Sequence, residues 1–169
     1  MGKLGGSMLE KDKLYISFHK PKTPVGYLIS LWTFGKYSHC EFVYGDEVFL
    51  ANPEGVRRQK FKFKNNMEIY ELDESIEWIR IYEVFKELEG KGYDYLAIFL
   101  SQFLYPLGIE SKNKYFCSEL CLKCIDVALD ESLTYNLKSL KSKGYHKFNP
   151  NRLYKYLKFM ELIKEKEMI

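Results

Sequence analysis

The sequence predicts an α+β domain in which an antiparallel sheet packs against helices. Two β-rich runs, 37–44 and 47–52, are separated only by Gly45-Asp46, which is typical of a tight hairpin. Two further runs alternate apolar and polar residues, as half-buried strands do. After Cys117, apolar residues recur at helical spacing, which predicts a helix that begins near this cysteine.

The other elements follow from local patterns. We expect further strands at 14–18, 56–64 and 67–72, helices at 25–34, 76–88, 94–103, 117–129 and 152–164, and a loop over 132–144. Within 78–85, β-branched and aromatic residues leave a strand open as an alternative. Phe61 and Phe63 are expected to face inward, as are Ile76 and Ile79.

Composition favours one compact domain. The chain has 169 residues, 46% of them hydrophobic, which is enough for a sizeable core. We interpret 1–8 as a tag or linker and 9–169 as a single domain. A net charge of +3 is too small to indicate nucleic acid as a partner. No apolar run is long enough for a transmembrane segment and no signal peptide is recognised, so the expected location is cytoplasmic.

The spacing of the four cysteines argues against a disulfide framework and against a metal site. Three of the four lie between Cys117 and Cys124, which is unlike a secreted, disulfide-bonded domain. The spacing Cys117, Cys121, Cys124 on one helix is not a usual zinc-ligand spacing, and burial on the core stripe explains the latter two. No glycine-rich phosphate loop is present, so no metal or cofactor is expected.

Cys117 is the candidate nucleophile. It precedes the apolar stripe of its helix, which places it in the first turn. Unpaired N–H groups and the partial positive charge of a helix N-terminus favour the thiolate. Taken alone, however, Cys117 is equally compatible with a small buried apolar residue.

His39 is the candidate general base, and the register of the hairpin predicts which side chain lies beside it. A two-residue turn pairs Tyr44 with Glu47 and, further along, His39 with Asn52. Asn52 could then fix the tautomer of the imidazole. A one-residue bulge would bring Glu54 into play instead, and Glu41 shares the face of His39. Without a cysteine partner, His39 would be an ordinary half-buried strand residue.

Several strings together resemble the circularly permuted NlpC-type papain-like superfamily. They are Tyr37-Ser38-His39-Cys40-Glu41-Phe42-Val43, Ala51 to Arg57, Gly92-Tyr93-Asp94-Tyr95, Tyr115-Phe116-Cys117-Ser118-Glu119-Leu120 and Asn149-Pro150-Asn151-Arg152-Leu153. The resemblance spans His39 to Leu153. In the permuted branch the histidine strand precedes the cysteine, as it does here. The family is related to lecithin:retinol acyltransferase-like proteins.

The resemblance implies a permuted papain-like fold with the nucleophile at a helix N-terminus. It assigns Cys117 as nucleophile, His39 as general base and a polar residue on the following strand as the third member, where the hairpin register points to Asn52. The implied chemistry is acyl transfer through an acyl-enzyme, with the backbone N–H of Cys117 as oxyanion donor. A second donor, such as Tyr27, is left unassigned.

The expected function is a cysteine amidase or peptidase. A lipid acyltransferase or thioesterase of the same fold is the alternative, and a non-catalytic binding module is a second one. The expected partner is a small-molecule, peptide or lipid acyl substrate, and peripheral membrane contact stays open. If the interpretation holds, Cys117 is rich in thiolate near neutral pH, and His39→Ala raises its pKa while Cys121→Ser changes it little.

Overall fold

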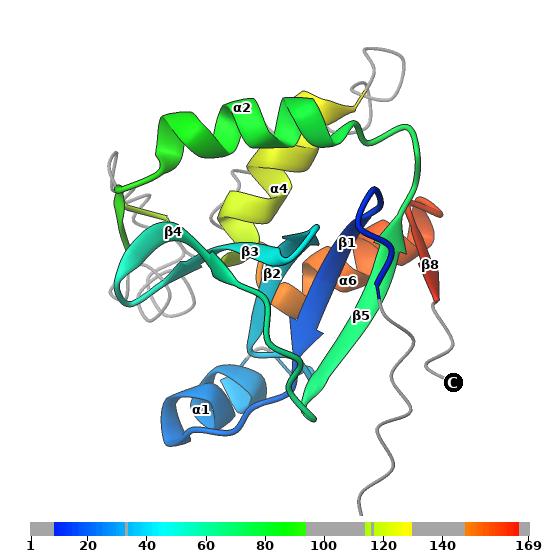
Figure 1. Cartoon of the computed structure of the whole chain (residues 1–169). Coiled ribbons are helices and arrows are strands. Elements are labelled where there is room, and N and C mark those ends of the chain that lie inside the picture. The colour runs from blue at the N-terminus through cyan, green and yellow to red at the C-terminus, as the bar shows by residue number, and fades with distance from the viewer. Residues whose placement is uncertain (1–8, 33, 94–113, 116, 130–147, 166–169) are drawn as a thin grey trace, which may run out of the picture.

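The computed structural model of the chain describes residues 9–32, 34–93, 114–115, 117–129 and 148–165 (Figure 1). This part of the chain is an α+β structure, with a six-stranded antiparallel sheet and four helices. The helix expected at 94–103 and the loop expected at 132–144 lie outside the described residues.

The sheet has the strand order β4-β3-β2-β1-β5-β8, and every neighbouring pair is antiparallel. Its strands are β1 (Leu14–His19), β2 (His39–Tyr44), β3 (Glu47–Asn52), β4 (Gly55–Lys60), β5 (Met67–Leu72) and β8 (Ile163–Glu165). A separate parallel pair, β6 (Gly92–Tyr93) with β7 (Lys114–Tyr115), lies outside this sheet. The central strand β1 is buried along its whole length.

The hairpin of β2 and β3 has the predicted register at its turn. Tyr44 pairs with Glu47 and Phe42 with Phe49, so the two-residue connection is confirmed. Gly45 has a positive φ of 61°, a conformation that hairpin turns of this length require and that glycine adopts without steric cost. The turn therefore fixes which β2 side chains share a face.

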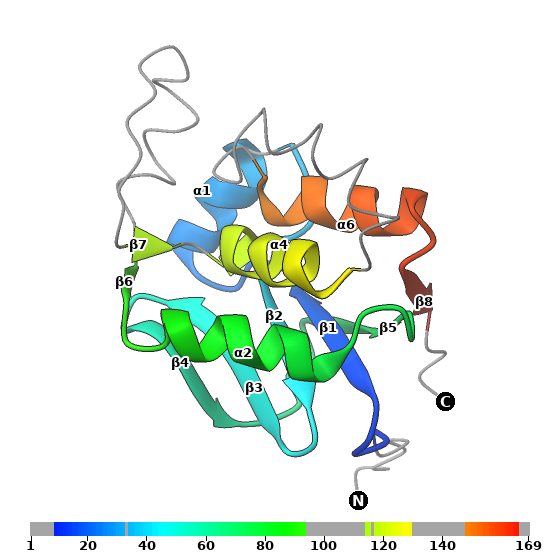
Figure 2. The same ribbon diagram turned by 90° about the horizontal axis from the view of Figure 1, so that it is seen from above.

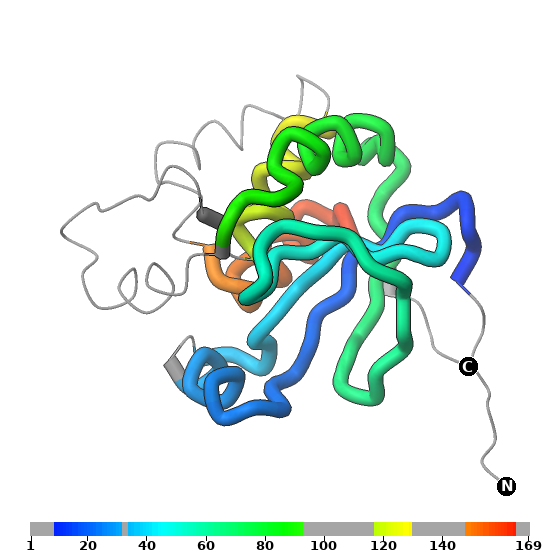
Figure 3. The backbone as a smooth tube through the Cα atoms, turned by 60° about the vertical axis from the view of Figure 1, so that its left-hand side comes forward, coloured from blue at the N-terminus to red at the C-terminus, as the bar shows by residue number. Residues whose placement is uncertain are grey.

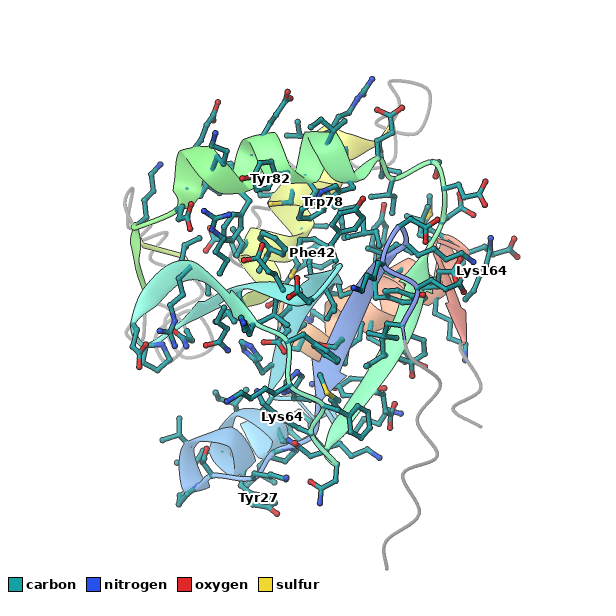
Figure 4. All side chains as sticks on the ribbon, viewed as in Figure 1. Tyr27, Phe42, Lys64, Trp78, Tyr82 and Lys164 are labelled. Atoms are coloured by element: carbon teal, nitrogen blue, oxygen red, sulfur yellow. The ribbon has the colours of Figure 1, made fainter. Side chains whose placement is uncertain are left out.

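Three helices cover one face of the sheet (Figure 2). They are α2 (Trp78–Leu88), α4 (Cys117–Ala128) and α6 (Pro150–Phe159), and α4 packs on β2 and β3 between the other two. The main core lies at this junction. Tyr44 stacks on Trp78 with ring centroids 4.3 Å apart, and the Phe49 ring lies 4.6 Å from Trp78; Figure 4 labels Trp78 at the side of α2 that faces the sheet. The fourth helix, α1 (Pro24–Trp32), stands apart from this layer.

The opposite face of the sheet carries a smaller apolar cluster. Its buried members are Tyr15, Val43, Val48, Leu50, Met67 and Ile69, with Phe61 packed against them. Side chains alternate between the two faces along each strand, so in β2 Cys40 and Phe42 belong to the helix-covered core while Val43 belongs to the smaller cluster. His39 and Glu41 alternate with Cys40 and lie on the same side as Val43.

Several local expectations were wrong. The last helix ends at Phe159 rather than 164, because Ile163–Glu165 pairs with β5 as an edge strand. Segment 78–85 is helical, so the strand alternative is excluded. Ile79 is exposed, since α2 turns Ile81 and Phe85 toward the core instead.

Phe63 is a further correction. It is exposed because β4 ends at Lys60, before the alternation that was expected to turn Phe63 inward.

Candidate active site

The site forms where the first residue of α4 meets the start of β2. Cys117 opens α4 and is buried, only 3% exposed. Its thiol lies within hydrogen-bonding reach of the His39 imidazole and of the Cys40 thiol. The predicted position of Cys117 in the first turn of a helix is confirmed. The structure therefore brings together the candidate nucleophile and the candidate base, which are far apart in sequence.

A buried asparagine anchors the segment that leads into β2. Asn151, in the first turn of α6, accepts a hydrogen bond from the backbone N–H of Tyr37 and donates one to its carbonyl, both at 2.8 Å. A Cβ on Gly35 would collide with the Asn151 side chain, so this close approach requires glycine. The anchor fixes the backbone two residues before His39, and Asn149 caps the same helix by accepting from Arg152 N–H at 2.9 Å.

Glu41 lies between two imidazoles. Its Oε2 is 3.3 Å from His39 Nε2, and its Oε1 is 3.0 Å from His19 Nε2. Glu41 shares the face of His39 because the two are separated by one residue of β2. His19 comes from β1, where it pairs with His39 across the sheet, and the two rings are 5.2 Å apart at 89°. Ser17 Oγ lies 3.2 Å from His19 Nε2.

The electrostatics of this cluster favour an ion pair between Cys117 and His39. The Cys40 thiol, by hydrogen bonding, lowers the pKa of Cys117 well below its usual value against the opposing effect of burial, and His39 lowers it further. Burial alone would lower the pKa of His39, but Cys117 and Glu41 raise it to about 10. A thiolate and an imidazolium thus stabilise each other.

Glu41 and His19 are held in different charge states: Glu41 is ionised and His19 is neutral. Burial would raise the pKa of Glu41, but hydrogen bonds from His19 and His39 hold it well below the usual carboxyl range. Burial lowers the pKa of His19, which favours its neutral form, while the Glu41 hydrogen bond opposes this. A neutral His19 with its proton on Nε2 donates to Glu41, so the carboxylate keeps its charge for His39.

The remaining cysteines are buried thiols without such an arrangement. Burial raises the pKa of both Cys40 and Cys124 well above the usual value. Cys124 lies two turns into α4, away from the helix terminus. Cys40 Sγ is 3.9 Å from Cys121 Sγ, which places these two side by side in the core. All four cysteines are free thiols.

Asn52 and Glu54 have other partners. Asn52 Oδ1 accepts a hydrogen bond from the Glu54 backbone N–H at 3.0 Å, as a turn residue does. The Glu54 carboxylate pairs with Arg57. The pairing of β2 with β3 runs from Tyr44 and Glu47 to Phe42 and Phe49, and in this part of the described chain it does not extend to the expected pair of His39 with Asn52. Of the three candidates for the third position, the structure places Glu41 against His39.

The structure also places Tyr27 and His19. Tyr27 lies on α1 with its side chain 61% exposed, and Figure 4 shows it at the end of the molecule, which offers no support for a role as oxyanion donor. Sequence reasoning missed His19, which directly follows the expected strand 14–18 and is the last residue of β1. The signal available was a histidine at the end of a strand that would pair with the histidine strand.

The described residues hold no group of three or more His, Cys, Asp or Glu side chains that could bind a metal ion. None of the described helices is long and apolar enough to cross a bilayer. The chain matches no protein-family model, and no curated protein sequence matches it.

Proposed function

We propose that this protein is a cysteine hydrolase of the permuted NlpC-type papain-like kind, acting on amides through an acyl-enzyme. Cys117 is the nucleophile, His39 the general base and acid, and Glu41 the residue that orients His39. His19 is a positioning residue that holds Glu41. Asn52, the partner expected from the hairpin, has no part in this proposal.

One observation carries the proposal: a buried thiol at the start of α4 lies against an imidazole whose other side faces a buried carboxylate. Glu41 occupies Nε2 of His39, which leaves Nδ1 for the thiol. A structural cysteine needs neither partner. Depressed thiol and raised imidazole pKa values on adjacent groups are typical of activated nucleophiles.

In the first half of the reaction, the Cys117 thiolate attacks the amide carbonyl carbon, and the C=O electron pair becomes an oxyanion. The backbone N–H of Cys117 is suitably placed at the helix terminus to stabilise that charge. As the tetrahedral intermediate collapses, the C–N bond breaks and the His39 imidazolium gives its proton to the leaving nitrogen. The products of this half are a thioester and a free amine.

In the second half, neutral His39 takes a proton from water while the water oxygen attacks the thioester. Collapse of this second intermediate breaks the C–S bond and releases a carboxylic acid. The thiolate and the imidazolium are restored, so neither oxidant nor metal enters the balance. Glu41 remains ionised throughout and stabilises the imidazolium form of His39.

This scheme sets a pH window. The reactive ion pair requires Cys117 to be ionised and His39 to be protonated. Activity should rise through the lowered pKa of Cys117 and fall as pH passes the His39 pKa of about 10. A plot of kcat/KM against pH should therefore be flat through neutrality. A profile that begins to rise only near the ordinary thiol pKa of about 8.5 would contradict the assignment.

Acyl transfer to an acceptor other than water, as in a lipid acyltransferase or thioesterase, is the second candidate. It uses the same thioester and differs only in what resolves it. The specific observation in its favour is the exposed apolar surface of α1, which joins the two histidine strands. Supplying acyl esters and amides with and without added amine or alcohol acceptors would separate the two candidates by their products.

The first test is alkylation by iodoacetamide as a function of pH, with each cysteine located by peptide mass spectrometry. Cys117 should react at neutral pH, whereas Cys124 serves as an internal reference that stays unmodified. His39→Ala should slow Cys117 labelling near neutral pH by up to about thirtyfold. This limit follows because an ordinary thiol with a pKa of about 8.5 is only about one-thirtieth thiolate at pH 7. The same variant should lower kcat/KM by about 10²–10⁴-fold.

Urea-unfolded protein provides the control for reagent quality, since all four thiols should then react alike. If folded Cys117 labels no faster at neutral pH than an ordinary thiol, or if His39→Ala leaves its rate unchanged, the catalytic proposal fails. The domain would then be treated as a binding module.

A further inference from the structure

Exposed apolar side chains are concentrated at α1. Of the nine large apolar side chains that are exposed among the described residues, five lie between positions 25 and 34. We call these five the α1 patch: Val25, Tyr27, Leu28, Leu31 and Phe34. Their exposed fractions run from 56% to 93%, and the helix projects from the body of the molecule (Figures 1 and 3). Scattered apolar residues are normal on a surface, whereas a contiguous group indicates a binding surface.

The patch follows the helix geometry. Val25, Leu28 and Leu31 are three residues apart and Tyr27 is four before Leu31, so neighbouring members lie on adjacent turns. The inward side carries Gly26, which is buried close to Thr23 and Ser38. From 24 to 34 the sequence contains no charged residue. The helix is therefore apolar where a solvent-facing helix is ordinarily polar.

Phe34 combines an exposed side chain with an unfavourable backbone conformation. Its φ is +48°, in the left-handed region that aromatic residues rarely adopt, and its side chain is 93% exposed. The backbone thus accepts an unfavourable conformation and gains no core contact for the ring. Strain of this kind is typical of functional surfaces.

Lysines flank the patch in the sequence and lie on the adjoining β4–β5 connection. Lys20, Lys22 and Lys36 flank α1 in sequence, and Lys62 and Lys64 belong to the β4–β5 connection, with exposed Phe63 between them. The two segments are held together: Lys20 N–H donates to the Asn66 carbonyl at 2.8 Å, and the Lys22 side chain bonds Asn65. Figure 4 shows Tyr27 and Lys64 at the same end of the molecule.

Charge in this region is strongly one-sided. Segments 20–36 and 61–66 contain no Asp or Glu. Lys20 and Lys36 share one carboxylate, that of Glu68, at 2.8 and 2.9 Å. Two of the five lysines are therefore paired with Glu68, and the sequence of α1 between them carries no charge. Apolar side chains bordered by lysines match the interface of an anionic bilayer, where acyl chains lie beneath phosphate groups.

We propose that α1 and the β4–β5 connection dock the protein on an anionic lipid surface. The α1 patch and Phe63 enter the interface, and the lysines contact lipid phosphates. A second copy of this chain is the less suitable occupant, because two such faces would bring like charges together. Docking does not depend on the proposed function.

The placement has a consequence for the site, and this consequence does rest on the proposed function. α1 lies in the connection from β1 to β2, between His19 and His39. Docking by α1 brings the ends of these two strands close to the membrane. The substrate class that fits is then an amide or ester presented by the lipid surface, rather than one free in solution.

The test is co-sedimentation of the full chain with vesicles of phosphatidylcholine alone and of phosphatidylcholine mixed with phosphatidylglycerol. The protein should bind the anionic vesicles, and added salt should weaken binding by screening the lysines. Leu28→Ser/Leu31→Ser should lower the partition coefficient at least about tenfold, because less apolar area is buried. Lys22→Glu/Lys64→Glu should do the same through charge.

Matched controls separate docking from general surface effects. Ile79→Ser on α2 changes a side chain that is 57% exposed, as Leu28 is, and should leave binding unchanged. Lys155→Glu on α6 is the corresponding charge control. Circular dichroism and thermal melting check that each variant is folded. Cys117→Ala should retain full vesicle binding, so loss of catalysis and loss of docking are distinguishable.

Absence of binding to anionic vesicles would overturn the proposal, as would equal binding to neutral vesicles or equal binding by all variants. Light scattering of the protein without vesicles tests whether a second copy of the chain binds the α1 patch instead. A dimer that Leu28→Ser/Leu31→Ser converts to a monomer would assign the α1 patch to a second copy and would also overturn it.

Discussion

Cys117 and Cys124 lie on the same helix, two turns apart, and both are buried. Burial raises the pKa of Cys124 well above its usual value. The pKa of Cys117 moves the other way, because the Cys40 thiol and the His39 imidazole stabilise its anion more than burial opposes it. Both residues are buried cysteines, so neither residue type nor burial explains the opposite directions of their pKa shifts. The two cysteines differ in position: Cys117 lies at the N-terminus of α4 and faces His39 and Cys40 of β2, whereas Cys124 lies within the helix.

The charge of Glu41 is expected to be the largest contribution beyond His39 itself. Glu41→Gln keeps the shape but removes the anion that stabilises the imidazolium, so His39 protonates less readily and Cys117 loses its counter-ion. Hydrogen bonds to charged groups contribute about 1.5–3 kcal/mol, which corresponds to roughly a ten- to hundredfold slower alkylation of Cys117 at mildly acidic pH. Equal rates in wild type and Glu41→Gln would remove Glu41 from the site.

His19 tests whether positioning of Glu41 matters. His19→Leu leaves Oε1 of Glu41 without its 3.0 Å partner, so the carboxylate is free to turn away from His39. We expect about tenfold slower Cys117 labelling at mildly acidic pH, in line with loss of one charge-assisted hydrogen bond. His19→Gln, which keeps an N–H donor, should restore much of the rate. A purely structural role would change the melting temperature of both variants without changing the pH profile of labelling.

Although the Cys40 thiol strongly lowers the pKa of Cys117, we expect its removal to have a smaller effect on labelling, because His39 still stabilises the thiolate. The S–H of Cys40 donates to the Cys117 thiolate, and Cys40→Ala removes this donor. A net hydrogen bond of about 0.5–1 kcal/mol corresponds to roughly two- to fivefold slower labelling of Cys117 near neutral pH. Cys40→Ser supplies a stronger O–H donor and should preserve the rate. Faster labelling in Cys40→Ala would show that the thiol only restricts access.

Cys124→Ala is expected to have the smallest effect. The side chain packs in the core, two turns from the site, so the labelling profile of Cys117 should be unchanged while stability falls by about 1 kcal/mol, measured by urea unfolding. Cys121 is the less suitable control, because its Sγ is only 3.9 Å from that of Cys40. An altered Cys117 profile in Cys124→Ala would mean that the whole helix, not its first turn, sets the reactivity.

Local sequence patterns were sufficient to predict several elements of the fold. The Gly45-Asp46 turn determined the register of β2 and β3 near Tyr44 and Glu47, and strand 67–72 has the bounds its alternation predicted. The apolar stripe after Cys117 correctly placed this residue in the first turn of α4. These features depend on neighbours within a few residues, so periodicity and turn chemistry reveal them.

Long-range pairing decided the rest. Glu41 was one of three open candidates for the third position, and only the approach of β1, which brings His19 to its other oxygen, shows how that carboxylate is held. The edge strand Ile163–Glu165 likewise exists because β5 offers it hydrogen bonds. Partners distant in sequence leave no local pattern. The amino-acid sequence was therefore sufficient to identify Cys117 and His39 as candidates. Only the pairing of distant strands places the Glu41 carboxylate beside His39, and only the packing of the elements leaves the apolar face of α1 exposed.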